Sequence, residues 1–60
     1  MRLFTVVEAA ELLRVGPDWV YERINRGLLP VVELGETRKN QRIRGSDLAE
    51  FIEARVYGAR

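Results

Sequence analysis

Apolar side chains recur at helical spacing in three stretches of the chain, and the first stretch begins at residue 5. Thr5 and Glu8 form a capping box, in which each side chain accepts a hydrogen bond from the other residue's backbone N–H. We therefore expect a helix from Thr5 to about Arg14. Its inner face should consist of small and aliphatic side chains: Val6, Ala9, Ala10 and Leu13.

Two features around this first helix bear on how it is covered. Leu3 or Phe4, just before the capping box, should pack over the helix. Val7 falls near the polar side of the helix, where a charged residue would be expected. It is either covered by the N-terminal residues or exposed as a contact point.

The second stretch, residues 16–27, carries its own start and stop signals. Gly16 suits the N-cap, and Pro17 suits the first helical position because its missing N–H is not needed there. Gly27 suits the left-handed residue that follows a helix. The link to the first helix is so short that the two helices must cross at a large angle, as in a helix-turn-helix. The inner face of this second helix should carry Val20 and Ile24.

Two short segments after the second helix have the composition of strands. Val31–Leu34 is rich in β-branched residues, and Gln41–Arg44 alternates polar and apolar side chains. Turn-forming and charged residues fill Gly35–Asn40, so we expect a two-stranded hairpin, called the wing below. The side chains expected to face the helices are Val32, Leu34 and Ile43.

The last amphipathic stretch begins at Ser46, which suits an N-cap, and places Asp47 in the first turn. Its apolar stripe should close the core with Leu48, Phe51, Ile52 and Val56. Residues 57–60 should form a frayed tail or a short contact segment. The order of elements predicts one α+β domain over residues 1–60, a small winged helix-turn-helix with a hairpin wing and a C-terminal helix.

The composition argues against catalysis and metal binding. The chain has no histidine and no cysteine, which removes the usual general base, the commonest metal ligand and any disulfide. No glycine-rich phosphate loop or nucleophile–base pair is present. We expect no enzyme activity, no metal, no cofactor and no small-molecule ligand. Because neither a signal-peptide pattern nor a long apolar run occurs, we expect a cytoplasmic protein without membrane association.

The net charge is only +1, but the positive charge is concentrated in one segment. Residues 31–45 hold four basic side chains against two carboxylates, whereas residues 1–30 are neutral and residues 46–60 are net negative. At the wing tip, Arg38 and Lys39 suit the minor groove of DNA. Along the strand that follows, Arg42 and Arg44 suit phosphate contacts. The alternative is a charged edge strand that blunts aggregation.

The second helix offers a set of candidate DNA contacts on the sides away from Val20 and Ile24. They are Trp19, Tyr21, Glu22, Arg23, Asn25 and Arg26. The two arginines suit phosphates or guanine, the glutamate suits the cytosine amino group, and the asparagine suits adenine. The hydroxyl of the tyrosine suits a phosphate.

Each of these assignments has a purely structural alternative. Tyr21 and Trp19 can pack in the core, although helical geometry should turn Trp19 away from the inner stripe. Glu22 and Arg26 are four residues apart and can pair with each other on a solvated face.

Strings along nearly the whole chain resemble the small winged-helix proteins of the phage excisionase family, also called recombination directionality factors. They are equally similar to prophage regulators and to the DNA-binding part of mercury-resistance-type activators. The strings are Thr5-Val6, Ala9-Ala10-Glu11-Leu12-Leu13, Val20-Tyr21, Ile24, Arg26-Gly27, Leu29-Pro30, Gly35, Arg42-Ile43-Arg44, Ser46-Asp47-Leu48 and Phe51-Ile52.

The resemblance implies a protein that binds repeated sites in a phage attachment region of double-stranded DNA and bends that DNA. Such a protein would help a partner integrase run recombination towards excision, in the nucleoid of a bacterial host. Head-to-tail association of monomers on DNA would strengthen a modest single-site affinity. Two alternatives stay open. One is a prophage transcriptional regulator of the same fold, and the other is a protein-interaction module that uses the surface around Trp19 and Tyr21.

Overall fold

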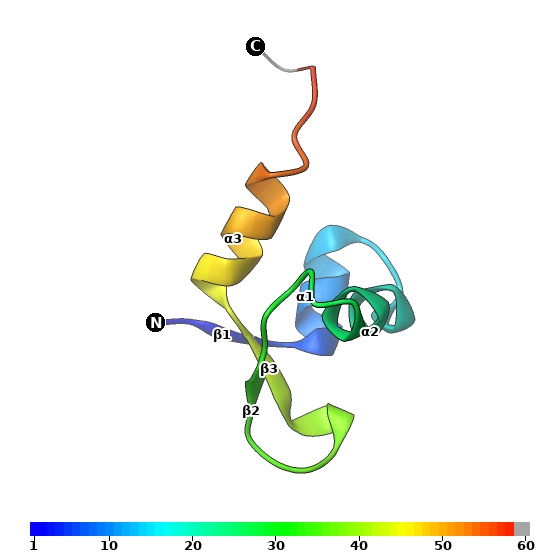
Figure 1. Cartoon of the computed structure of the whole chain (residues 1–60), viewed down its shortest axis with the longest axis vertical. Coiled ribbons are helices and arrows are strands. Elements are labelled where there is room, and N and C mark those ends of the chain that lie inside the picture. Colours follow the sequence, from blue (N-terminus) through cyan, green and yellow to red (C-terminus); the bar gives the residue numbers. More distant parts are fainter. Residues whose placement is uncertain (59–60) are drawn as a thin grey trace.

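The computed structural model describes residues 1–58, and within them three α-helices surround one end of a three-stranded antiparallel sheet (Figure 1). The elements in chain order are β1 (Leu3–Thr5), α1 (Val6–Leu13), α2 (Pro17–Asn25), β2 (Val32–Glu33), the short 3-10 helix η1 (Arg38–Asn40), β3 (Gln41–Arg44) and α3 (Gly45–Glu53). This arrangement confirms the predicted fold class, an α+β winged helix-turn-helix.

The start of α1 is the capping box that the sequence predicts. The Thr5 backbone N–H donates to Glu8 Oε1 at 2.9 Å, and the Glu8 N–H donates to Thr5 Oγ1 at 3.0 Å. The helix ends at Leu13 because Arg14 takes the left-handed conformation, with φ of 61°. Non-glycine residues rarely adopt this left-handed conformation. At Arg14 it reverses the chain in the short turn before α2.

The second helix also begins and ends where the sequence predicts. Gly16 is its N-cap and Pro17 its first residue. Gly27 has φ of 75°, and the N–H groups of Gly27 and Leu28 donate to the carbonyls of Ile24 and Arg23. This pair of bonds satisfies two carbonyls that a helix end leaves open. The chain can then turn sharply away from α2 towards the sheet.

The sheet contains a strand that the sequence analysis did not predict. Residues expected only to lead into α1 form β1, which pairs antiparallel with β3, so the strand order is β1-β3-β2. Phe4 lies opposite Ile43, and Leu3 lies opposite Arg44. The predicted two-stranded wing is therefore part of a three-stranded sheet whose middle strand is β3.

The register of β2 corrects the prediction for its side chains. Val32 pairs with Arg42, so it lies on the sheet face opposite to Ile43, which is fully buried. Val31 packs against the core instead, and Leu34 is 60% exposed. The expectation that Val32 and Leu34 face the helices is wrong by one residue, and such a shift exchanges the two faces of a strand.

The third helix begins earlier and ends earlier than predicted. Its first residue is Gly45 and its N-cap is Arg44, so Ser46 is not the cap. Asp47 does lie in the first turn. Val56 lies beyond the helix and is 48% exposed, so it does not extend the apolar stripe. Tyr57 is exposed, and the last two positions of the predicted tail, 59 and 60, lie outside the described residues.

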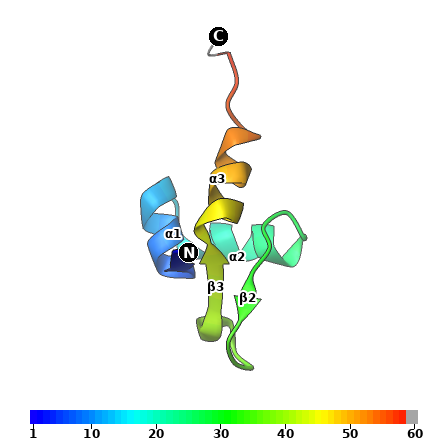
Figure 2. The same ribbon diagram turned by 90° about the vertical axis from the view of Figure 1, so that its left-hand side faces the viewer.

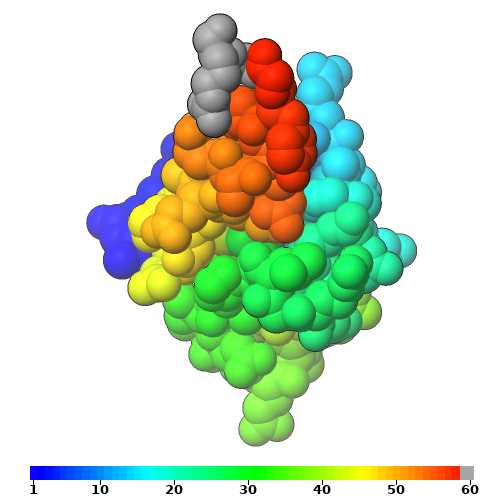
Figure 3. Space-filling model, turned by 45° about the horizontal axis from the view of Figure 1, so that its top comes forward, coloured from blue at the N-terminus to red at the C-terminus, as the bar shows by residue number. Residues whose placement is uncertain are grey.

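The core lies where the three helices meet β3. Its buried side chains are Val6, Ala9, Ala10, Val20, Leu29, Ile43, Leu48 and Phe51. Ala9 and Ala10 are small, which lets α2 approach α1 closely, while Val7 is half exposed rather than covered. In Figure 2, α3 and the wing extend in opposite directions along the long axis. Figure 3 shows the tip of the wing as a narrow yellow-green projection at the end opposite the orange and red residues that end and follow α3.

Candidate nucleic-acid interface

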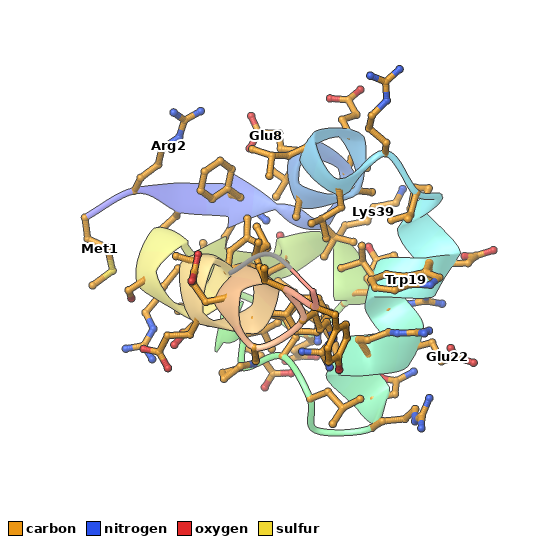
Figure 4. All side chains as sticks on the ribbon, turned by 90° about the horizontal axis from the view of Figure 1, so that it is seen from above. Met1, Arg2, Glu8, Trp19, Glu22 and Lys39 are labelled. Carbon is orange, nitrogen blue, oxygen red and sulfur yellow. The ribbon has the colours of Figure 1, made fainter. Side chains whose placement is uncertain are left out.

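The outer side of α2 is polar and open to solvent. Glu22, Asn25 and Arg26, three of the predicted DNA contacts, are exposed there, together with Asp18. Figure 4 shows Glu22 pointing away from the body of the molecule. The Glu22 carboxylate pairs with the neighbouring Arg23 guanidinium, whereas the alternative considered from the sequence was a pair with Arg26. This side of α2 can therefore be approached by a large partner.

Trp19 lies between α2 and α3 and not on the outer side of α2. Its ring packs edge-to-face against Phe51, with 6.1 Å between the ring centroids. The Arg23 guanidinium lies over the Trp19 ring, with its central carbon 3.8 Å from the ring centroid. The prediction that helical geometry turns Trp19 away from the core is wrong. Because α3 covers one flank of α2, the buried face of α2 includes Trp19 as well as Val20 and Ile24.

Tyr21 lies on the opposite flank of α2 and contacts the wing. The guanidinium carbon of Arg38 lies 3.7 Å from the centroid of the Tyr21 ring. The Tyr21 hydroxyl points to the Arg38 carbonyl oxygen at 3.4 Å, a long hydrogen bond. Tyr21 is partly buried. Its ring packs against the core and also joins α2 to the wing. The outer side of α2 and the wing tip thus form one continuous surface.

The wing tip is shaped by side chains that the sequence analysis did not single out. Asn40 Nδ2 donates to Thr37 Oγ1 at 3.2 Å, and the Asn40 carbonyl accepts from the Leu34 N–H at 2.9 Å. Gly35 faces the Asn40 side chain so closely that an added Cβ would lie 2.8 Å from Asn40 Cγ. The turn-forming residue types in this segment are the signal that could have identified these contacts.

Besides Arg38, two of the four predicted wing cations lie at or beside this turn. Lys39 is exposed, and among residues 1–58 its ammonium forms no hydrogen bond or ion pair. Arg42 is half buried and donates from one guanidinium nitrogen to the carbonyls of Lys39, at 2.9 Å, and Gln41, at 3.0 Å. Lys39 is therefore available to an anion, while Arg42 also fixes the backbone of the turn.

Arg44 is held by the first turn of α3. Its Nε donates to Asp47 Oδ2 at 2.5 Å and its second guanidinium nitrogen donates to Oδ1 at 3.0 Å. This hydrogen-bonded carboxylate raises the pKa of the Arg44 guanidinium above its ordinary value, and the charge of Asp47 acts in the same direction. The ion pair joins the end of β3 to α3. It also offsets the charge that Arg44 would offer to a phosphate.

The described part of the chain encloses no pocket and no cluster of three or more side chains that could hold a metal ion. None of its helices has the length and apolar character that a membrane crossing requires.

Fold and surface together define a small winged helix-turn-helix, with an exposed second helix beside a cationic wing. Residues 3–56 match the protein family described as a helix-turn-helix domain. The chain therefore belongs to this family, a DNA-binding family that includes excisionase-like proteins. Comparison with curated proteins and with solved structures gives no match in either set.

Proposed function

We propose that this protein is a sequence-specific DNA-binding and DNA-bending protein that acts as an excisionase. In this role it binds repeated sites in a phage attachment region and directs integrase-mediated recombination towards excision. The proposal combines membership of a DNA-binding family with the resemblance of its sequence strings to recombination directionality factors. It implies action in the cytoplasm, on nucleoid DNA, without catalysis or a cofactor.

The continuous surface formed by α2 and the wing carries the proposal. A helix of this size fits the major groove, and a cationic hairpin beside it fits the neighbouring minor groove or backbone. Tyr21 in α2 touches Arg38 in the wing, so both elements would meet one DNA duplex from the same side. On this surface, Asn25 and Arg26 suit base or phosphate contacts, and Lys39 suits a phosphate.

Salt dependence is the direct test of the phosphate contacts. Each neutralised phosphate contributes about 0.9 to the slope of log affinity against log salt concentration. We expect Lys39→Ala to weaken binding to every DNA sequence and to lower the slope by about this amount. Arg26→Ala should weaken binding as well, and a loss that differs between DNA sequences would identify a base contact. Arg55→Ala, which removes an exposed cation just after α3, is the matched control and should leave the slope unchanged.

The role in recombination needs a second experiment. Fluorescently labelled attachment-region DNA and a scrambled duplex are titrated with the protein at two salt concentrations, with and without purified integrase. Cooperative binding to the attachment region, with an integrase complex that forms only when the protein is present, is the expected result. Specific binding that is indifferent to integrase would refute the excisionase role.

That second outcome would favour a prophage transcriptional regulator of the same fold, which occupies an operator and needs no recombinase. A protein-interaction module is the alternative of a different class. The position of Trp19 weighs against it, because this ring is packed between α2 and α3 and is only partly exposed. Absence of salt-dependent binding to any duplex at low salt would overturn the DNA-binding proposal and leave the interaction module.

A further inference from the structure

We propose that Tyr21 is a positioning residue, which acts on DNA through Arg38 by holding the wing against α2. The inference rests on the proposed DNA-binding function and deepens it. The sequence alone suggested instead that the Tyr21 hydroxyl donates to a phosphate. In the structure this hydroxyl points at the Arg38 carbonyl, and the ring lies under the Arg38 guanidinium.

The contact between Tyr21 and Arg38 connects α2 to the wing. Within residues 1–58, the hydrogen bonds of the wing turn otherwise join residues of the hairpin to one another, as in the bonds from Asn40 to Thr37 and from Arg42 to Lys39. The bond from Tyr21 to Arg38 is the hydrogen bond that crosses from α2 to this turn. Without the tyrosine, the turn would keep its internal shape but lose its tie to α2.

The contact between Tyr21 and Arg38 preorganises the surface proposed to meet DNA. A surface whose two parts are already fixed relative to each other loses less freedom when it binds than one whose parts move independently. A guanidinium lying over an aromatic ring is also restricted in orientation while its N–H edge stays available to an anion. Arg38 can therefore meet a phosphate from the position in which Tyr21 holds it.

The size of the effect follows from the contact. An exposed cation–π pair stabilises its geometry by an amount that corresponds to roughly a two- to five-fold change in an equilibrium constant. We expect Tyr21→Leu, which removes the ring without changing charge, to weaken DNA binding by roughly this factor. Tyr21→Phe keeps the ring under the guanidinium and loses only the long hydrogen bond to the Arg38 carbonyl, so it should retain most of the affinity. A loss with Tyr21→Phe as large as with Tyr21→Leu would show that the contact between ring and guanidinium is not the cause and would overturn the proposal.

A double-mutant cycle separates positioning from direct contact. The affinities of wild type, Tyr21→Leu, Arg38→Ala and the double variant are measured by fluorescence anisotropy on one labelled duplex. Arg38→Ala removes the guanidinium but keeps the backbone carbonyl to which the Tyr21 hydroxyl points. If Tyr21 acts through the guanidinium, Tyr21→Leu should lose most of its effect in the Arg38→Ala background. Losses that simply add would show that Tyr21 does not act through the Arg38 guanidinium. Arg55→Ala is the matched control, since Arg55 is also a cation over an aromatic ring, Phe51, but follows the end of α3.

The contact can be followed without DNA as well. A proton held over an aromatic ring is shifted upfield in the NMR spectrum, so the Arg38 side-chain protons should be shifted in wild type and in Tyr21→Phe. The shift should disappear in Tyr21→Leu. If Tyr21→Leu does not fold, Tyr21→Met replaces it, because it keeps an apolar side chain and the net charge while it removes the ring, and the same roughly two- to five-fold loss is expected.

These readouts distinguish two kinds of failure. If wild type binds no DNA while the upfield shift is present, the contact exists and the proposed function fails. If wild type binds DNA but the shift is absent, or the variant without the Tyr21 ring binds as wild type does, the positioning role fails and the function stands.

Discussion

Gly35→Ala should destabilise the wing because the Asn40 side chain occupies the space that a new methyl group needs. The added Cβ would lie 2.8 Å from Asn40 Cγ and 3.1 Å from Asn40 Cβ. Carbon atoms in contact prefer a separation of about 3.5–4.0 Å. The amide end of the side chain can rotate away, but its Cβ is fixed to the backbone. Both the rotamer and the turn must therefore change.

The magnitude follows from what Asn40 would lose. Its hydrogen bond to Thr37 Oγ1 is a neutral side-chain bond of a kind that contributes about 0.5–1.5 kcal/mol. Displacing a side chain from its preferred rotamer costs about 0.5–1.5 kcal/mol more. Reduced freedom of the unfolded chain offsets about 0.4–1 kcal/mol of this cost. We expect Gly35→Ala to lower the free energy of unfolding by about 1 kcal/mol, a large share of the roughly 3–5 kcal/mol that such a small core supplies.

Trp19 is the single tryptophan of the chain, so its fluorescence reports unfolding in urea or on heating. A loss of 1 kcal/mol corresponds to a fall in melting temperature of about 4–8 °C for a domain of this size. Gly45→Ala is the matched control. Its Cβ would meet the Arg2 carbonyl oxygen at 3.4 Å, an ordinary contact, so the same exchange should be neutral or stabilising there.

A second substitution tests the stated cause. Asn40→Ala removes Cγ and the amide, so Gly35→Ala should cost clearly less in that background than in wild type. The reasoning is refuted if Gly35→Ala melts at the wild-type temperature. It is refuted equally if its cost is unchanged when Asn40 is alanine, because the clash would then not be the cause.

Three further predictions follow from contacts described above. Thr5→Ala should lower the free energy of unfolding by about 0.5–2 kcal/mol because the capping box is lost, whereas Ser46→Ala, at a position that is not an N-cap, should change it little; urea denaturation compares the two. Ile43→Val should lower the free energy of unfolding by about 0.5–1.5 kcal/mol, since it removes a methyl group from a fully buried side chain and leaves a small cavity, and an unchanged urea midpoint would contradict the assigned core. Arg44→Ala should lower the salt slope of DNA binding less than Lys39→Ala does, because Asp47 already pairs with Arg44; equal slopes for the two variants would contradict this.

The sequence predicted the elements whose causes are local. The capping box of α1, Pro17 at the start of α2 and Gly27 after its end each act through groups within a few residues. The inner stripes of the helices follow from the same short-range periodicity. Arg42 and Arg44 alternate with the buried Ile43 on β3, as the strand pattern indicated.

The parts that the sequence did not predict depend on distant neighbours. Residues 3–5 carry no strand signal of their own and become β1 because β3 offers an edge to pair with. Trp19 is buried partly by Phe51 of α3. A helical wheel of α2 alone cannot show a contact with another helix. The pairing of Val32 with Arg42, and so the face on which Val32 lies, is set across the hairpin. Two adjacent valines in a short strand leave that choice open.

The pairing of β1 with β3 has a consequence for the order in which the molecule folds. Helices α1 and α2 are neighbours in sequence and can dock through local contacts, whereas β1 must find β3, which follows both helices and β2 in the chain. Pairing across such a separation is slow, because the entropy of closing the intervening chain is lost before the pairing rewards it. We therefore expect folding kinetics governed by the meeting of the first residues with β3. A growing polypeptide on the ribosome would possess its helix-turn-helix well before it possessed an anchored wing.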